Sequence, residues 1–311
     1  MPRTPPTHDD PSRAPNAAAD VGRVTVLNVG AAAIPVDEGR PGWAHLAVTT
    51  SGAFDRPAYR LANRLVGNRP GAVAVEFVLG PMTMRFSTHA TLAVTGIDAD
   101  LTLQQPGRHA QSVSTHSTLM VPAGSVLRIG MARSGLRGYL AIRGGWKVDR
   151  VLGSGSHDTL ADLGPPPLRA GDQLPVGSDF DDFPAVDHAP RPSTVNDLDL
   201  TLLPAHRAGV MGTARDTLAE LAWTVSPASN RIGVRLAGPS LVAARQRASE
   251  PLVRGAVQLP PNGQPVIMGP DHPTTGGYPV IGVIADVDTD RLAQARPGSR
   301  VRLIPVPDPR A

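Results

Sequence analysis

The sequence has no cysteine, and this absence excludes three kinds of chemistry at once. Disulfide bonds, thiolate metal sites and a cysteine nucleophile all need the thiol group. A chain of 311 residues is long enough to bury a hydrophobic core without such cross-links. The absence also fits a reducing compartment, and we expect the protein in the cytoplasm.

Lysine is nearly absent too, because Lys147 is the only one among 30 basic residues. It lies in Trp-Lys-Val, and neither in the Gly-Lys-Ser/Thr loop that cradles phosphates nor in the Met-Lys-Met setting of a biotin acceptor. Arginine is scattered among acidic residues, so the pI near 9.9 does not predict a nucleic-acid surface. If the chemistry involves ATP or biotin, we expect another polypeptide to supply the usual apparatus.

Long apolar runs are missing as well. The first 22 residues hold no apolar run of about 7 residues, so they do not predict a signal peptide. No window of about 18 uninterrupted apolar residues predicts a membrane-spanning helix. The nine histidines form no His-x-x-x-His or Glu-flanked pair, so we predict no metal site.

Glycine and proline, by contrast, are abundant, with 32 and 33 residues, which is too many for a helical bundle. Short β-branched or alternating segments recur about every 8 to 12 residues between turn residues, a spacing typical of barrels and sandwiches. We therefore predict a mainly β fold with a few short helices. The expected strands are 24–29, 73–79, 82–86, 90–95, 98–103, 118–121, 126–129, 138–142, 198–203, 301–306 and one from Val280.

The chain divides into a tail and two halves. Residues 1–22 are poor in apolar residues and predict a disordered tail. Breakers and acidic residues between 178 and 196 mark the boundary, which gives one β-barrel subdomain over 23–185 and another over 196–308. A turn of a small residue, Gly and a polar residue before an alternating strand occurs three times, which hints at related halves; it begins at Ala123, Ala170 and Pro297.

Helical spacing is clear only after Asp55, which predicts an N-cap, with Pro57 in the first turn and Gly67 as the stop. Asn63 falls among the apolar positions of this helix, where we expect a hydrogen-bonded structural residue rather than a ligand. A second helix is predicted around 213–223.

The stretch from Glu250 to Asp286 has the form of a binding site. Its apolar strands flank a polar turn that contains Asp271, Thr275 and the glycine pair 276–277, where a ligand can approach the main chain. An ordinary surface turn between barrel strands is the alternative. Ser156-His157-Asp158 resembles a triad only in writing, because neighbouring side chains diverge.

Arginines add candidate anion sites. Arg40 is held between Gly39 and Gly42 on a stiff turn, or is a plain solvated residue. Arg231 and Arg235 alternate with apolar residues, so on one strand they would share a face and could grip a carboxylate or phosphate; a solvated edge is equally compatible.

The chain from Val24 to Val306 resembles a known family, which unites allophanate hydrolase subunit 2, the C subunit of 5-oxoprolinase and the biotin-dependent carboxyltransferases. Ordered blocks at matching spacing carry this resemblance. They are 37–42 (DEGRPG), 51–55 (SGAFD), 61–68 (LANRLVGN), 95–96 (TG), 135–145 (GLRGYLAIRGG), 151–154 (VLGS), 231–236 (RIGVRL), 255–265 (GAVQLPPNGQP) and 275–279 (TGGYP).

The resemblance implies cyclophilin-like β-barrels and a companion first subunit, with a third lactam-utilisation subunit as a further possible partner. It implies ATP-dependent hydrolysis of 5-oxoproline to glutamate, or, as the alternative, carboxyl transfer from carboxybiotin to urea. A non-catalytic partner of a kinase-inhibitor subunit is the third reading. ATP would be bound with or by partner subunits, and biotin belongs to the alternative. His272-Pro273 departs from the more frequent Arg-Gln at the central turn.

Polar residues inside these blocks are the candidate site, because a barrel mouth gathers side chains from distant loops. Arginine suits a carboxylate, Gln amides suit a lactam or urea edge, and glycine N–H groups suit an oxyanion. The expected catalytic residues are Asp271, Thr275 and Tyr278, with Asp271 as acid or base or simply closing its own turn. The expected substrate-binding residues are Arg40, Arg231, Gln258, Gln264, Gly276 and Gly277.

Overall fold

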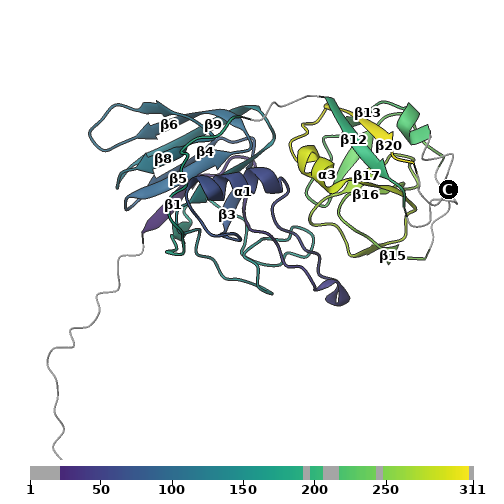
Figure 1. The fold of residues 1–311 in the computed structure, drawn as a ribbon, viewed down its shortest axis with the longest axis horizontal. Helices are drawn as coiled ribbons and strands as arrows, with labels where there is room; N and C mark the ends of the chain where they lie inside the picture. Colours follow the sequence, from purple (N-terminus) through teal and green to yellow (C-terminus); the bar gives the residue numbers. More distant parts are fainter. Residues whose placement is uncertain (1–21, 192–196, 206–216, 243–247, 308–311) are drawn as a thin grey trace, which may run out of the picture.

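The protein is described here by a computed structural model, which places residues 22–191, 197–205, 217–242 and 248–307. The described chain forms two β-rich lobes that lie side by side, with the N-terminal lobe on the left in Figure 1. Nearly all of the tail predicted for residues 1–22 lies outside the described residues, as do residues 213–216 of the second expected helix. The described part of that helix, 217–220, is helical, and Trp223 already begins a strand.

The first lobe consists of two antiparallel sheets that share a hydrophobic core, which includes Phe77, Met84 and Leu101. One sheet has six strands in the order β11 (Gln173–Pro175), β1 (Arg23–Asn28), β4 (Met82–Phe86), β9 (Val126–Ser134), β6 (Asp98–Gln104), β7 (Gln111–Val113). The other has five in the order β2 (Ala33–Val36), β3 (Ala74–Val78), β10 (Arg137–Ile142), β5 (Ala90–Thr95), β8 (Thr118–Val121).

The second lobe is a closed barrel around its own core. Its strands run β12 (Asp197–Leu203), β19 (Val280–Ile284), β16 (Ala256–Gln258), β17 (Val266–Met268), β14 (Gly233–Ala237), β13 (Trp223–Val225) and β20 (Arg300–Pro305), and parallel pairing of β20 with β12 closes the ring. A short ribbon of β15 (Glu250–Pro251) and β18 (Thr275–Gly276) lies beside it. The mainly β fold expected from the sequence is confirmed.

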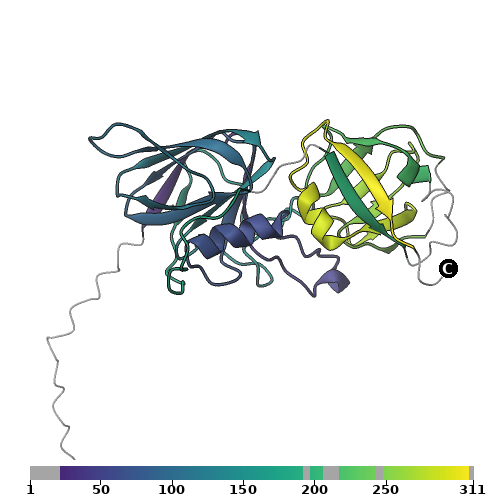
Figure 2. The same ribbon diagram turned by 45° about the horizontal axis from the view of Figure 1, so that its top comes forward.

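Helices α1 (Arg56–Leu65) and α3 (Asp286–Leu292) are short and lie where the lobes meet, whereas the helical residues 217–220 lie on the far side of the second lobe (Figure 1). Helix α1 packs its Ala58, Tyr59 and Ala62 against the five-stranded sheet. As expected, Asp55 caps it by accepting a hydrogen bond of 2.9 Å from the Ala58 amide. Helix α3 belongs to the second lobe and faces α1 in both ribbon views (Figures 1 and 2), while the 3-10 helix η1 (Ala44–Leu46) lies at the tip of a loop.

Side chains cross between the lobes. Phe54, from the loop before α1, is fully buried in the core of the second lobe. Arg56 at the start of α1 pairs with Asp290 of α3 at 2.9 Å, and Arg254 reaches the same carboxylate at 2.7 Å. Gln294 accepts hydrogen bonds from the amides of Leu136 and Arg137 at 2.8 and 3.0 Å. These contacts hold the two lobes against each other.

Of two local predictions, one on turns and one on a strand face, the structure supports the first and contradicts the second. All three repeated turns place their glycine at positive φ, 76° at Gly124, 98° at Gly171 and 87° at Gly298, which only glycine adopts without strain. The shared face expected for Arg231 and Arg235 is wrong, because β14 begins at Gly233 and leaves Arg231 buried before it while Arg235 is exposed.

Two further observations concern buried polar groups and membranes. Asn63 is the structural residue expected, donating to the Ala72 carbonyl at 3.1 Å and accepting from Asn68 at 2.7 Å. In the described ranges, no helix is both long and apolar enough to cross a membrane.

Candidate functional site

A buried cluster of charges lies between the lobes, centred on Arg231. Its guanidinium makes two hydrogen bonds to Asp271, at 2.8 and 3.0 Å, and reaches across to Glu76 of β3 at 2.7 Å and to the Gly52 carbonyl at 2.6 Å. Only 7% of Arg231 and 2% of Glu76 is exposed, and Asp271 is completely buried. The cluster therefore joins a loop of the barrel to the first lobe through charges that are largely shielded from water.

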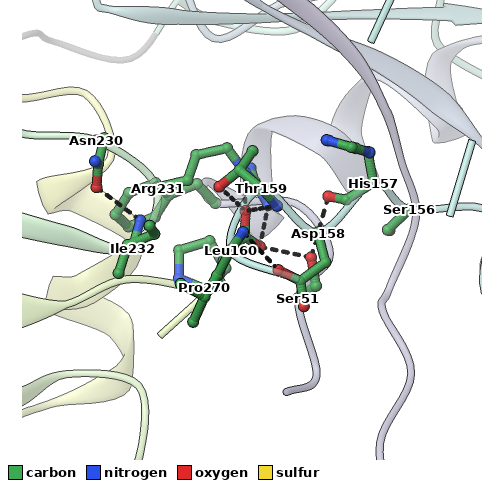
Figure 3. Close-up of polar contacts among 12 residues, drawn as sticks. Ser51, Ser156, His157, Asp158, Thr159, Leu160, Asn230, Arg231, Ile232 and Pro270 are labelled. Atoms are coloured by element: carbon green, nitrogen blue, oxygen red, sulfur yellow. Dashed lines mark hydrogen bonds and ion pairs between the residues drawn. The ribbon is translucent and has the colours of Figure 1, made fainter. Parts of the chain in front are cut away.

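Asp271 also accepts hydrogen bonds from first-lobe loops. The Ser51 hydroxyl donates at 2.5 Å, and Thr159 donates its amide at 3.0 Å and its hydroxyl at 2.7 Å, as the close-up in Figure 3 shows around Ser51 and Thr159. Burial alone would raise the pKa of Asp271, but the Arg231 charge and these hydrogen bonds outweigh it and hold the pKa below its ordinary 3.8. The carboxylate stays ionised and its oxygens are fully engaged.

Most N–H groups of Arg231 are likewise engaged in hydrogen bonds within the cluster. Burial would lower its pKa, yet Asp271 and Glu76 more than compensate and raise the pKa above its ordinary value. A guanidinium has five N–H groups, and the contacts above use four of them. Among the described residues, one Nη1 N–H has no acceptor and is left for a ligand. Arg231 can thus assist in binding an oxygen atom, but a bidentate grip on a substrate carboxylate would require it to release Asp271.

Glu76 is the first-lobe partner on which this geometry depends. It accepts hydrogen bonds from the Tyr139 hydroxyl at 2.9 Å and from the Phe54 amide at 3.0 Å, and its carboxylate lies 3.4 Å from Arg137. Arg137 in turn lies over the Phe54 ring at 4.5 Å and donates to the Ala293 carbonyl at 2.6 Å. Its Nε has no hydrogen-bond partner within the described part of the chain.

A cavity of about 460 Å³ opens beside this cluster. It is large enough for a small organic molecule and lies between the lobes, where ligand sites are common. Its polar wall presents cationic and hydroxyl groups close to one another, and its apolar wall comes from both lobes. The polar lining consists of Glu76, Arg137, Thr159, Ser229, Asn230 and Arg231.

Arg40 lies on a neighbouring first-lobe turn and is 1% exposed. It donates to the carbonyls of Ser156 and Val151, the latter at 3.3 Å, while its Nη1 has no partner among the described residues. Burial lowers the pKa of Arg40 despite the opposing charge of Asp158, whose Oδ2 is also buried and unpartnered in the described chain. The solvated alternative for Arg40 is therefore wrong, and the turn is a built, buried feature.

The stretch Ser156-His157-Asp158 does not form a triad. The Ser156 hydroxyl donates to Asp37 at 2.6 Å, and Asp158 accepts instead from the amides of Leu160 and Ala161, at 2.9 and 3.1 Å. Figure 3 shows the His157 ring turned away from the Asp158 carboxylate.

Residues predicted around the central turn form a second group. Gln258 is buried and donates to the Tyr278 carbonyl at 3.2 Å, and a side chain at Gly276 would meet the Gln258 amide at 2.5 Å. Thr275 is exposed on β18, and the Tyr278 side chain is 39% exposed. The main chain at Gly276 thus runs so close to the Gln258 amide that a side chain at this position would have to displace it. Gly277 beside them is half-buried.

Gln264 lies apart from both groups. Its amide makes two hydrogen bonds to the backbone of Gly238, at 3.0 and 3.1 Å, and so ties a loop to the end of β14. His272, the residue after Asp271, donates from Nδ1 to the Pro273 carbonyl at 2.8 Å, and burial lowers its pKa. This neutral ring leaves Nε2 as an acceptor, 3.5 Å from the Thr49 hydroxyl.

Sequence reasoning missed Glu76, Ser51, Thr159 and Arg137. Glu76 lies in a strand of otherwise apolar residues, and a charge in such a strand was the available signal, since buried charges need partners. Ser51 and Thr159 carry no such signal, because hydroxyl residues are common in loops.

Comparison with known proteins gives consistent matches. Residues 46–305 match the family model "Carboxyltransferase domain, subdomain A and B". The chain is 35% identical to the C subunit of 5-oxoprolinase from Escherichia coli over 86% of each chain. The crystal structure of TTHA0988 has a TM-score of 0.82 at 31% identity and covers 92% of this chain, which spans 56% of that one. Kluyveromyces lactis urea carboxylase has a TM-score of 0.81 at 28% identity, and this chain spans 27% of it.

Proposed function

Because the chain belongs to the family of carboxyltransferase domains, subdomains A and B, we propose that it is the C subunit of a 5-oxoprolinase-type complex. This complex would hydrolyse the lactam bond of 5-oxoproline to give glutamate, with ATP. One observation carries the proposal: 86% of this chain matches 86% of a 5-oxoprolinase C subunit, whereas it matches only about a quarter of a urea carboxylase.

The cavity beside Arg231 supports a substrate of this kind. A small lactam with a carboxylate needs N–H donors for its oxygens. Arg231 and Arg137 both line the cavity, and one Nη1 N–H of Arg231 has no partner among the described residues. We propose that these arginines hold the substrate oxygens while Asp271, Glu76 and Thr159 fix the position of Arg231. Asp271 is then a positioning residue, because a carboxylate with a lowered pKa and engaged oxygens is a weak proton acceptor.

The second group, Gln258, Gly276, Gly277, Thr275 and Tyr278, is proposed as a further part of the binding surface. It offers an exposed hydroxyl at Thr275 and a half-exposed phenol at Tyr278 beside a main chain that approaches Gln258 closely. Such groups fit contact with a substrate or with a partner subunit. Thr275 and Tyr278 as catalytic residues stay predictions, as does Arg40 as a substrate-binding residue.

We propose that ATP is bound with or by companion subunits and that the chain acts in the cytoplasm. Two companions are expected, one carrying the homologous first half and one for lactam utilisation. The catalytic groups of the complex are then divided between chains, which fits a site in which the Arg231 guanidinium is mainly engaged by the carboxylates of Asp271 and Glu76.

Carboxyl transfer to urea is the second candidate, favoured by the similarity in fold to Kluyveromyces lactis urea carboxylase. Biotin would then be carried by another domain. Neighbouring genes discriminate cheaply: genes for the two companions favour the lactam reaction, and a gene for a biotin carboxylase favours the urea reaction.

The direct test is assay of the co-purified complex with 5-oxoproline and ATP. Release of glutamate is expected, and absence of product at saturating substrate would overturn the lactam assignment. Asp271→Asn in the same complex separates the roles of that residue. A fall in kcat of about 10² with unchanged unfolding would assign chemistry to Asp271, whereas joint loss of turnover and stability is what a positioning residue predicts.

A further inference from the structure

A second cavity lies between the lobes, along helix α1, and the proposed reaction does not use it. It has a volume of about 380 Å³ and is enclosed by α1 on one side and by α3 with the residues after it on the other. It shares Ala295 with the wall of the first cavity. Its apolar lining comes from Pro57, Ala58, Leu61, Pro190, Leu198, Val287 and Ala295.

The end of this cavity at the start of α1 is acidic. Asp55 lines it and accepts one hydrogen bond on each oxygen, 2.9 Å from the Ala58 amide and 2.7 Å from the Gln294 amide. Within the described chain, no arginine, lysine or histidine pairs with this carboxylate. Burial, together with nearby Asp290 and Glu76, raises the pKa of Asp55 to about 6, so near pH 7 it is an ionised group that a cation would stabilise.

The end of the cavity at the last turn of α1 is basic. Arg64 lines it, and among the described residues nothing hydrogen-bonds to its guanidinium. Arg64 is nine residues beyond Asp55, which corresponds to about 13 Å along a helix. Leu61 and Ala58 lie between the two charges, so the α1 side of the cavity presents an acid, an apolar wall and a base in sequence. On the α3 side, Asp290 and Arg291 also line the cavity, but each is already engaged in an ion pair.

His116 supplies an independent observation. It is 3% exposed and lines the cavity, and its Nε2 accepts a hydrogen bond of 3.3 Å from the Gly96 amide. Nδ1 therefore carries the proton, and it has no partner within the described ranges. A buried N–H without an acceptor is costly, and a turn of the His116 ring toward the cavity would let a ligand carbonyl or carboxylate satisfy it.

We propose that this cavity binds a small amphipathic zwitterion, with its ammonium group at Asp55, its apolar body against Leu61 and its carboxylate toward Arg64. The separation of the charges fits a di- or tripeptide, because two to three extended residues span about 7–11 Å and a hydrogen bond at each end adds about 3 Å. Since α1 and α3 belong to different lobes, the ligand also joins the lobes. This site does not depend on the lactam reaction.

Isothermal titration calorimetry of the full chain with the tripeptide Ala-Leu-Ala tests the proposal. The same tripeptide, acetylated and amidated, lacks both charges and should bind at least about tenfold more weakly, as expected for the loss of charge-assisted hydrogen bonds. Free leucine separates the two sources of a zwitterion. Leucine carries its ammonium and carboxylate on one carbon and cannot reach Asp55 and Arg64 together, so binding of leucine as tight as that of the tripeptide would overturn the charge assignment.

Variants locate the site. Arg64→Gln should weaken tripeptide binding by about tenfold, because one charged partner is lost. Val287→Trp should abolish binding by filling the cavity from α3, where Val287 is 71% exposed. Val242→Trp, at a residue that is 94% exposed and outside the cavity, is the matched control and should bind as the unmodified chain does. Equal binding of the capped peptide, undiminished binding by Val287→Trp, or no binding of any probe at millimolar concentration would each overturn the proposal.

Discussion

Replacing Arg231 by methionine tests whether the buried charge cluster holds the lobes together. Methionine keeps much of the length of the side chain and removes the guanidinium. Asp271 loses two hydrogen bonds and Glu76 loses one, of 2.7–3.0 Å, and both carboxylates stay buried at 0% and 2% exposure. Removing one partner of a buried ion pair typically costs about 3–5 kcal/mol, because the remaining charge is left uncompensated.

A loss of that size is large against a total of about 5–15 kcal/mol for a folded domain. The variant should also change the pH dependence of stability. In the unmodified chain the pKa of Asp271 is lowered, so its contribution is present above the unfolded pKa of 3.8 and is lost as the pH falls through the folded value. Without Arg231, burial dominates and raises the folded pKa. In the variant, the contribution of Asp271 to stability should then be most favourable below about pH 4 and be lost as the pH rises, which is opposite in sign to its contribution in the unmodified chain.

Urea denaturation followed by circular dichroism at several pH values measures both effects. Arg302→Met is the matched control, because Arg302 also binds one aspartate with two hydrogen bonds, both of 2.7 Å to Asp199, but on the surface. It should leave the unfolding midpoint nearly unchanged. A loss below about 1 kcal/mol for Arg231→Met, or a pH dependence identical to that of the unmodified chain, would refute the reasoning.

Three further predictions concern other parts of the molecule. Asp55→Asn keeps the N-cap but cannot ionise. Because the folded pKa of Asp55 is raised to about 6, the unmodified chain should lose stability relative to this variant as the pH rises from about 4 to about 6. Parallel pH curves of the unfolding midpoint would contradict this. Gly144→Ala should destabilise the chain by several kcal/mol more than Gly42→Ala. Both glycines have φ above +90°, but a Cβ at 144 would collide with the Gly177 carbonyl, whereas a Cβ at 42 would have no atom within contact distance. Similar melting temperatures of the two variants would show that the collision is harmless. The chain alone should lack 5-oxoprolinase activity and co-elute with its companion first subunit through an interface above about 1,000 Å², so separate elution at micromolar concentration would argue against a stable complex.

Much of the fold was predictable because its signals are local. The capped start of α1 depends on Asp55 and Pro57, which lie within three residues of each other. Strands β4, β5 and β8 have the predicted bounds, since alternation and turn residues mark both ends. Alternation alone was misleading for β14, because this strand begins at Gly233, later than the alternating residues suggested. Arg231 was therefore predicted on the same strand face as Arg235, although it lies before the strand.

The charge cluster was not predictable in the same way. Arg231 is 155 residues from Glu76 and 40 from Asp271, so no spacing rule connects them. The sequence named Arg231 and Asp271 separately, one as a substrate grip and the other as an acid or base. Their mutual pairing follows from how the barrel docks on the first lobe, and this is tertiary information that periodicity does not contain.

The cross-lobe pair between Glu76 and Arg231 has a consequence for synthesis on the ribosome. The 155 residues between them take about 8–30 s to translate at about 5–20 residues per second. Throughout this interval the nascent first lobe holds Glu76 without its second-lobe guanidinium, and Phe54 lacks the barrel core that buries it. Slow translation between residues 77 and 231 therefore prolongs exposure of an apolar ring on an unfinished chain, and the exposure continues until Leu303 completes the barrel core.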